Sequence, residues 1–159
     1  MGKGVEEAAG YAKLYKAPFN SPAGKALRAM DRAVLMQIML RYDGKNNGKI
    51  AIGKDELKSE LSAGDGVRKS IKVLIELGFL RRNKDAKWSS KLSYSRACEY
   101  AITFYPDNAT GLPATNEWRF KSELIVQRIM DEMMQKSDGA AVKPSSGYFD
   151  DDIDDLVPF

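Results

Sequence analysis

Residues 66–80 read GVRKSIKVLIELGFL, and this stretch decides the fold that the sequence predicts. Apolar residues recur in it at intervals of three and four, the spacing of one face of an α-helix. They are Val67, Ile71, Leu74 and Ile75. Arg68, Lys69 and Lys72 fall on the opposite face, and glycine, here Gly78, is the residue at which helices commonly end. The stretch therefore predicts an amphipathic helix with a basic outer face.

Upstream of this helix, the sequence predicts two further helices and a short strand. Ser21 followed by Pro22 is typical of a helix N-cap, and a single apolar stripe continues from it. The stripe consists of Leu27, Met30, Val34, Ile38 and Tyr42. Residues 49–52 form a strand candidate after an Asn-Asn-Gly turn. A short helix over residues 55–61, with carboxylates in its first turn, leads into a tight turn over residues 62–66.

Downstream, the pattern changes from helical spacing to alternation. Residues 94–105 alternate with a period of two, which predicts a β-hairpin with a long basic turn over residues 81–91. Thr115 is the expected cap of a final helix that ends near Ser137. The apolar residues of this helix are Trp118, Ile125, Ile129 and Met133. They favour either packing back on the domain or a homodimer or higher oligomer, and the sequence does not separate the two.

The composition excludes several classes of function. The chain has 159 residues, with one Cys and no His, so it has neither an imidazole base nor a histidine ligand for zinc. Cys98 alone cannot form a cysteine-rich metal site. We therefore expect no enzyme, no catalytic residue, no metal and no cofactor. No membrane span and no secretory signal core are recognisable, so we expect a cytoplasmic protein that binds no membrane.

The charge is divided unevenly along the chain. The overall net charge is +3, but residues 144–159 contain five Asp and no basic residue. The remainder has 25 basic residues against 17 acidic ones, a net charge of +8. A basic body of this kind indicates a polyanionic partner such as nucleic acid, although such a surface can also simply be solvated.

The order helix, short strand, helix, tight turn, basic helix, hairpin resembles that of a winged helix-turn-helix domain. Over about residues 26–105 the sequence is similar to the winged-helix DNA-binding domains of phage and plasmid replication or regulatory proteins. The resemblance implies an α+β fold with a β-hairpin wing and an added C-terminal helix. We expect a flexible arm over 1–20, the winged-helix domain over 21–136, a flexible linker over 137–149 and a disordered acidic tip over 150–159.

The same resemblance implies that the third helix enters the major groove and that basic residues of the wing contact phosphates. The wing also carries Trp88 and Tyr94 among its lysines, and single-stranded DNA binding uses such stacking rings beside cations. The candidate DNA-binding residues are Arg68, Lys69, Lys72, Arg81, Arg82, Lys84, Lys87, Trp88, Lys91, Tyr94 and Arg96. Winged helices also serve as protein–protein modules, and that alternative stays open.

About the last twelve residues resemble the acidic C-terminal tip of bacterial single-stranded-DNA-binding proteins. Such tips combine a run of aspartates with an apolar residue, proline and a final phenylalanine. The matching residues are Asp150, Asp151, Asp152, Ile153, Asp154, Asp155, Leu156, Val157, Pro158 and Phe159. The resemblance implies a partner-binding hook for genome-maintenance proteins of the host. On its tether, the tip could instead fold back on the basic DNA-binding surface or act as a solubilising tail.

Together the two resemblances favour a single-stranded-DNA-binding protein, phage or plasmid encoded, in the nucleoid-associated cytoplasm of a bacterial host. It would coat or protect DNA and recruit host replication, recombination or repair proteins through its tip. The alternative is a double-stranded-DNA-binding transcriptional regulator or replication initiator with a recruiting tail. A third hypothesis is an adaptor that binds only proteins.

Overall fold

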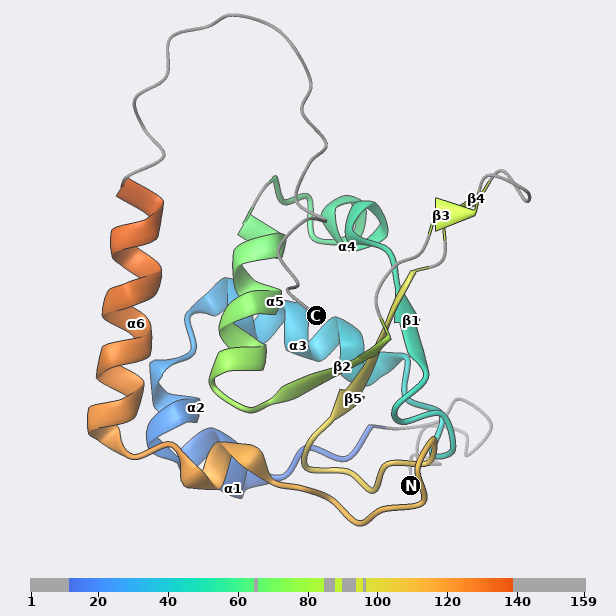
Figure 1. The fold of residues 1–159 in the computed structure, drawn as a ribbon, viewed down its shortest axis with the longest axis horizontal. Coiled ribbons are helices and arrows are strands. Elements are labelled where there is room, and N and C mark those ends of the chain that lie inside the picture. Colours follow the sequence, from blue (N-terminus) through green and yellow to red (C-terminus); the bar gives the residue numbers. More distant parts are fainter. Residues whose placement is uncertain (1–11, 65, 85–87, 90–93, 96, 139–159) are drawn as a thin grey trace, which may run out of the picture.

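The computed structural model describes residues 12–64, 66–84, 88–89, 94–95 and 97–138. Within these residues the fold is mixed α+β: six α-helices and a 3₁₀ helix accompany a three-stranded and a two-stranded antiparallel sheet (Figure 1). None of the helices in this described part is long and apolar enough to cross a membrane.

Of the arm expected over residues 1–20, the described part is packed against the domain. Residues Lys16–Asn20 form the short helix α1, and the ring of Phe19 lies 6.3 Å from that of Phe79 in the core. Tyr15 makes an edge contact with Tyr105, at 5.7 Å between ring centroids. The evenly spaced aromatic residues Tyr15 and Phe19 therefore hold this part of the arm against the domain.

The single helix predicted from Ser21 onward is wrong, because the chain breaks into α2 (Pro22–Ala26) and α3 (Ala29–Leu40). Ser21 does cap α2, since its hydroxyl accepts the backbone N–H of Gly24 at 3.0 Å. Arg28 is extended, and its backbone N–H donates to the carboxylate of Asp31 at 3.0 Å, which starts a new helix. The guanidinium of Arg32 donates to the carbonyl oxygens of Leu27 and Gly24 at the C-terminal end of α2.

The central prediction, the strand and two helices before the hairpin, is confirmed. The elements are β1 (Ile50–Ile52), α4 (Lys54–Glu60) and α5 (Gly66–Glu76). Helix α5 packs against α3, and the buried side chains of both helices join one hydrophobic core. Gly78 closes this segment with φ at +79°, a left-handed conformation that favours glycine.

The predicted hairpin is also present, but residues 81–84, expected in its basic turn, belong to its first strand, and its last strand ends at Ile102 instead of residue 105. It is formed by β2 (Leu80–Lys84) and β5 (Cys98–Ile102), and it continues into β3 (Trp88–Ser89) and β4 (Tyr94–Ser95). In the three-stranded sheet the order is β1-β5-β2, so β5 is the central strand. Both its faces are covered, since Tyr100 and Ile102 face the core while Ala101 is buried on the other face. The loop after β5 supplies that second cover, and its Asn116 N–H donates to the Thr103 carbonyl at 2.9 Å.

The final helix begins later than the sequence predicts. A 3₁₀ helix, η2 (Glu117–Phe120), precedes α6 (Glu123–Asp138), because Lys121 is extended and Ser122 caps the new helix. Helix α6 packs against α2 and α5 of its own chain. Trp118, Val126 and Ile129 are buried there, which is the first of the two packings predicted for this helix.

Candidate nucleic-acid interface

The amphipathic pattern of α5 places its cations on one exposed face. Helix α5 packs on α3, and its buried residues are Val67, Ser70, Ile71, Val73 and Leu74. Arg68, Lys69 and Lys72 consequently project away from the core and are exposed. None of the three is ion-paired with another described residue. Their positive charges are therefore available to an anionic partner.

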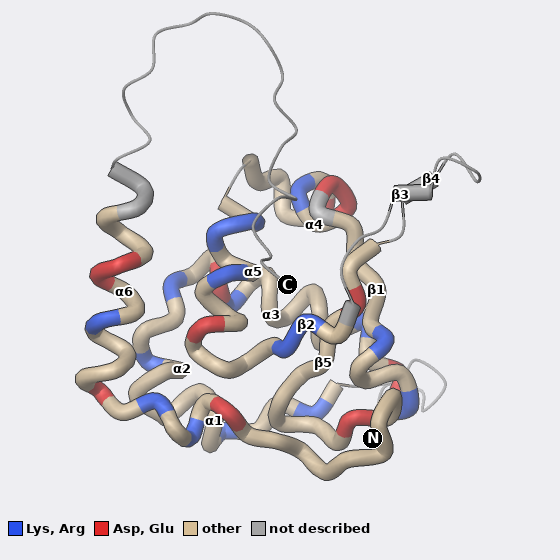
Figure 2. The backbone as a smooth tube through the Cα atoms, viewed as in Figure 1, with Lys and Arg blue, Asp and Glu red and all other residues tan. Residues whose placement is uncertain are grey.

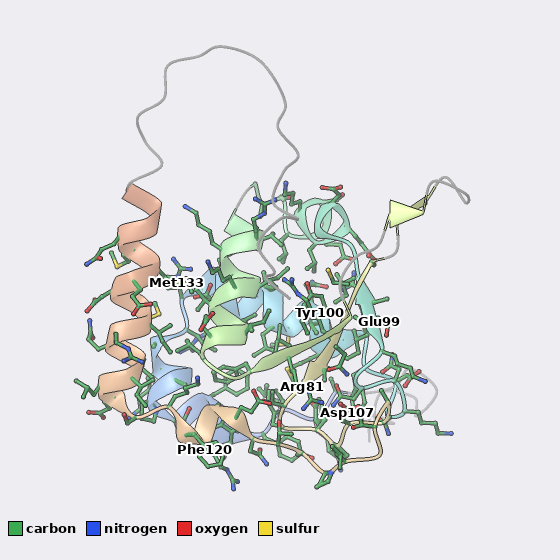
Figure 3. All side chains as sticks on the ribbon, viewed as in Figure 1. Arg81, Glu99, Tyr100, Asp107, Phe120 and Met133 are labelled. Atoms are coloured by element: carbon green, nitrogen blue, oxygen red, sulfur yellow. The ribbon has the colours of Figure 1, made fainter. Side chains whose placement is uncertain are left out.

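Two arginines of β2 lie on opposite faces of the sheet, because side chains alternate along a strand. Arg81 pairs across the sheet with Ala101 and faces the loop after β5, where its guanidinium forms an ion pair with Asp107 (Figure 3). A second carboxylate, that of Glu117, lies 3.9 Å from Arg81. Arg81 was predicted to contact phosphate. In the structure its charge is instead balanced by carboxylates, and it holds the loop after β5 against the sheet.

The electrostatics of Asp107 agree with that position. Burial alone would raise the pKa of this carboxyl group, but four groups that stabilise the charged form outweigh burial and lower the pKa. They are the backbone N–H groups of Ala109 and Thr110, the amide of Asn83 and the charge of Arg81. Asp107 is therefore a charged, hydrogen-bonded anchor for the loop.

Arg82 differs from its neighbour. It pairs across the sheet with Tyr100, so it lies on the face that packs toward the helices, and its side chain is exposed. Helix α5 contacts β2, and Figure 2 shows the basic positions of the two elements near each other. Burial and the neighbouring Cys98 thiol raise the pKa of Tyr100 to about 12 despite the opposing effect of Arg82. Tyr100 is thus an uncharged core residue beneath this surface.

The rest of the predicted interface lies at or beyond the limits of the described residues. The backbones of Lys84, Trp88 and Tyr94 belong to the hairpin, and β3 and β4 extend it away from the three-stranded sheet (Figure 1). Lys87, Lys91 and Arg96 lie outside the described residues, as do the acidic residues predicted to bind partners, 150–159.

A groove between α5 and α6 was not predicted. It has a volume of about 170 Å³ and is lined by two groups of side chains: an apolar group, here called the floor (Val73, Met130, Met133 and Met134), and a basic group, here called the rim (Arg28, Lys69 and Lys72). Met133 lies on the side of α6 that faces α5 (Figure 3). The helical spacing of methionines in α6 was the one available signal, and it does not reveal which element they face.

Among the described residues, the two lysines at the rim of this groove have no carboxylate partner, whereas Arg28 has one. Arg28 makes two hydrogen bonds from its guanidinium to Asp31, at 2.9 and 3.1 Å. Burial would raise the pKa of Asp31, yet hydrogen bonding, chiefly by Arg28, outweighs it and lowers the pKa. The buried carboxylate is therefore charged and neutralises Arg28, and the net positive charge comes from Lys69 and Lys72.

Comparison of the chain with protein-family models, curated proteins and solved structures found no match. Within the described residues, no three His, Cys, Asp or Glu side chains are grouped so that they could hold a metal ion. The features that bear on function are therefore the exposed cations of α5, the hairpin and the groove beside them.

Proposed function

We propose that the chain is a DNA-binding protein built on a winged helix, in which α5 is the recognition helix and the β2–β5 hairpin is the wing. The element order and the packing of α5 on α3 support this assignment. The observation that carries it is the exposed face of α5, where Arg68, Lys69 and Lys72 lie together without a carboxylate partner among the described residues.

On this proposal, the three cations of α5 and Arg82 contact phosphates, and binding displaces the counterions condensed on DNA. Arg81 does not join them, because it is held by Asp107 on the opposite face of the sheet. The scaffold keeps the binding helix rigid, since four apolar side chains of α5 are buried against the core: Val67, Ile71, Val73 and Leu74.

The preferred substrate in this proposal is single-stranded DNA. The sequence of the hairpin contains Trp88 and Tyr94, which are residue types on which bases stack, and the neighbouring sequence is basic. The acidic residues 150–159 then recruit genome-maintenance proteins to the bound strand. A second candidate, a duplex-binding regulator or initiator, is favoured by the regular exposed face of α5, which suits a major groove.

Fluorescence anisotropy tests both halves of the proposal. A labelled single strand of about 30 nucleotides, long enough for several sites of typical size, is compared with its own duplex over a range of salt concentrations. Tighter binding to the single strand supports the preferred substrate, and tighter binding to the duplex supports the second candidate.

A charge-matched pair of variants locates the interface. Replacing Arg68, Lys69 and Lys72 together with Ala should reduce the slope of log K against log [salt] by about 2, from about 0.7 per phosphate contact on a single strand. The control replaces Lys25, Lys45 and Lys49, which are also exposed but lie in other parts of the chain. An equal loss of slope in both variants would show that net charge, and not α5, determines binding.

A further inference from the structure

The α5–α6 groove combines an apolar floor with a basic rim. Its floor offers Val73 and three methionine side chains, and its rim offers Lys69 and Lys72, three residues apart on one face of α5. A cavity of about 150 Å³ is large enough for a benzene ring, so the volume of about 170 Å³ accommodates one aromatic or large aliphatic side chain. The groove therefore fits a peptide that is apolar at one point and acidic beside it.

One segment of this chain has that composition. Residues 150–159, DDDIDDLVPF, contain five aspartates and an apolar stretch that ends in Phe159. Methionine sulfur makes favourable contacts with aromatic rings, which suits Phe159 to the floor of the groove. The aspartates complement the rim, where the charges of Lys69 and Lys72 lack a carboxylate partner among the described residues.

The tether allows the two to meet within one molecule. Helix α6 ends at Asp138, and 11 residues separate it from Asp150. Such a linker spans at most about 36 Å when extended and about 18 Å on average as a flexible coil. The groove begins close to the end of α6, because Met134 is four residues, or about 6 Å of helix, from Asp138.

From this complementarity we infer that the α5–α6 groove is an intramolecular docking site for residues 150–159. Leu156 to Phe159 occupy the methionine floor, and the aspartates lie along Lys69 and Lys72. A short tether gives an effective concentration of about 1 mM, so a segment with an intrinsic Kd of about 0.1 mM is docked about 90% of the time.

The inference is tested in the full-length chain by NMR of ¹³C-methyl-labelled methionines. The methyl signals of Met130, Met133 and Met134 should shift when Phe159→Ala is introduced, since the ring no longer contacts them. Met39 is buried in the core away from the groove and is the internal control, whose signal should stay in place. Unchanged groove methionines in this variant would overturn the inference.

Two further measurements establish that such a shift comes from docking within one molecule. Lys69→Glu with Lys72→Glu should reproduce the shifts of the Phe159 variant, whereas the charge-matched Lys45→Glu with Lys49→Glu should not. Shifts that grow with protein concentration would mean docking between copies and would overturn an intramolecular contact. The readout contains no DNA, so its failure is distinguishable from failure of the proposed function.

Discussion

The amide of Asn47 ties the loop after β5 to the sheet, and replacing it with Ala should be strongly destabilising. Asn47 is completely buried, and its Nδ2 donates to the carbonyl oxygens of Ile102, Tyr105 and Pro106 at 2.9, 3.2 and 2.9 Å. Its Oδ1 accepts the backbone N–H of Ile102 at 2.7 Å. One side chain therefore pairs with four backbone groups at the start of the loop that holds Asp107.

The magnitude follows from the number of hydrogen bonds that the amide can make. Its two N–H hydrogens and one carbonyl oxygen amount to three full bonds, because the three acceptors share two hydrogens. At about 1 kcal/mol net for each bond, Asn47→Ala should cost about 3 kcal/mol in the free energy of unfolding. The peptide N–H of Ile102, left buried without its partner, increases the loss.

Urea unfolding followed by far-UV circular dichroism measures this loss, with Asn108→Ala as the matched control. Asn108 belongs to the same network but is exposed, and its Oδ1 accepts only the backbone N–H of Asn47, at 3.2 Å. The control should lose at most about 1 kcal/mol. Equal unfolding midpoints for the two variants would refute the argument that buried bonds of Asn47 hold the loop.

Three other predictions concern separate parts of the molecule. Gly78→Ala should cost more than Gly44→Ala in thermal unfolding, because both have positive φ but only the Cβ at Gly78 would lie within 3 Å of the η2 backbone. Folding lowers the pKa of Asp107, so its stabilising effect is complete above the unfolded pKa of about 3.9 and is lost as the pH falls further. The Asp107→Asn variant should therefore show a smaller decrease of Tm between about pH 5 and 2. If residues 150–159 compete with DNA for Lys69 and Lys72, Phe159→Ala should raise DNA affinity up to about tenfold in anisotropy titrations while it abolishes partner capture.

The sequence predicts α5 well because several signals agree there. Its apolar spacing, its basic outer face and Gly78 all indicate the same helix. The break between α2 and α3 is hidden, since Leu27 and Met30 keep the helical spacing across it. What decides the break is the pairing of the Arg28 N–H and guanidinium with Asp31, and sequence periodicity does not detect such side-chain bonds.

The candidate site shows the same limit. Strand alternation is enough to place Arg81 and Arg82 on opposite faces of β2, but it does not show whether a carboxylate matches Arg81. Asp107, 26 residues away in an irregular loop, decides that question by pairing with Arg81. The sequence likewise does not predict the groove, because Met133 of α6 and Lys69 of α5 are far apart in sequence and come together only when the helices pack.

The pairing of charges in the folded part explains why α5 is the proposed binding surface. Several acidic side chains there are already matched: Asp31 with Arg28, Asp107 with Arg81, and Glu56 and Glu60 with Arg41. The cations of α5 lack such partners among the described residues, while five aspartates are concentrated at positions 150–155. Since both DNA and this acidic segment are polyanions, each suits the same lysines. The proposed DNA binding and the proposed docking therefore compete for the same lysines. Partner proteins that capture residues 150–159 would make α5 accessible to DNA.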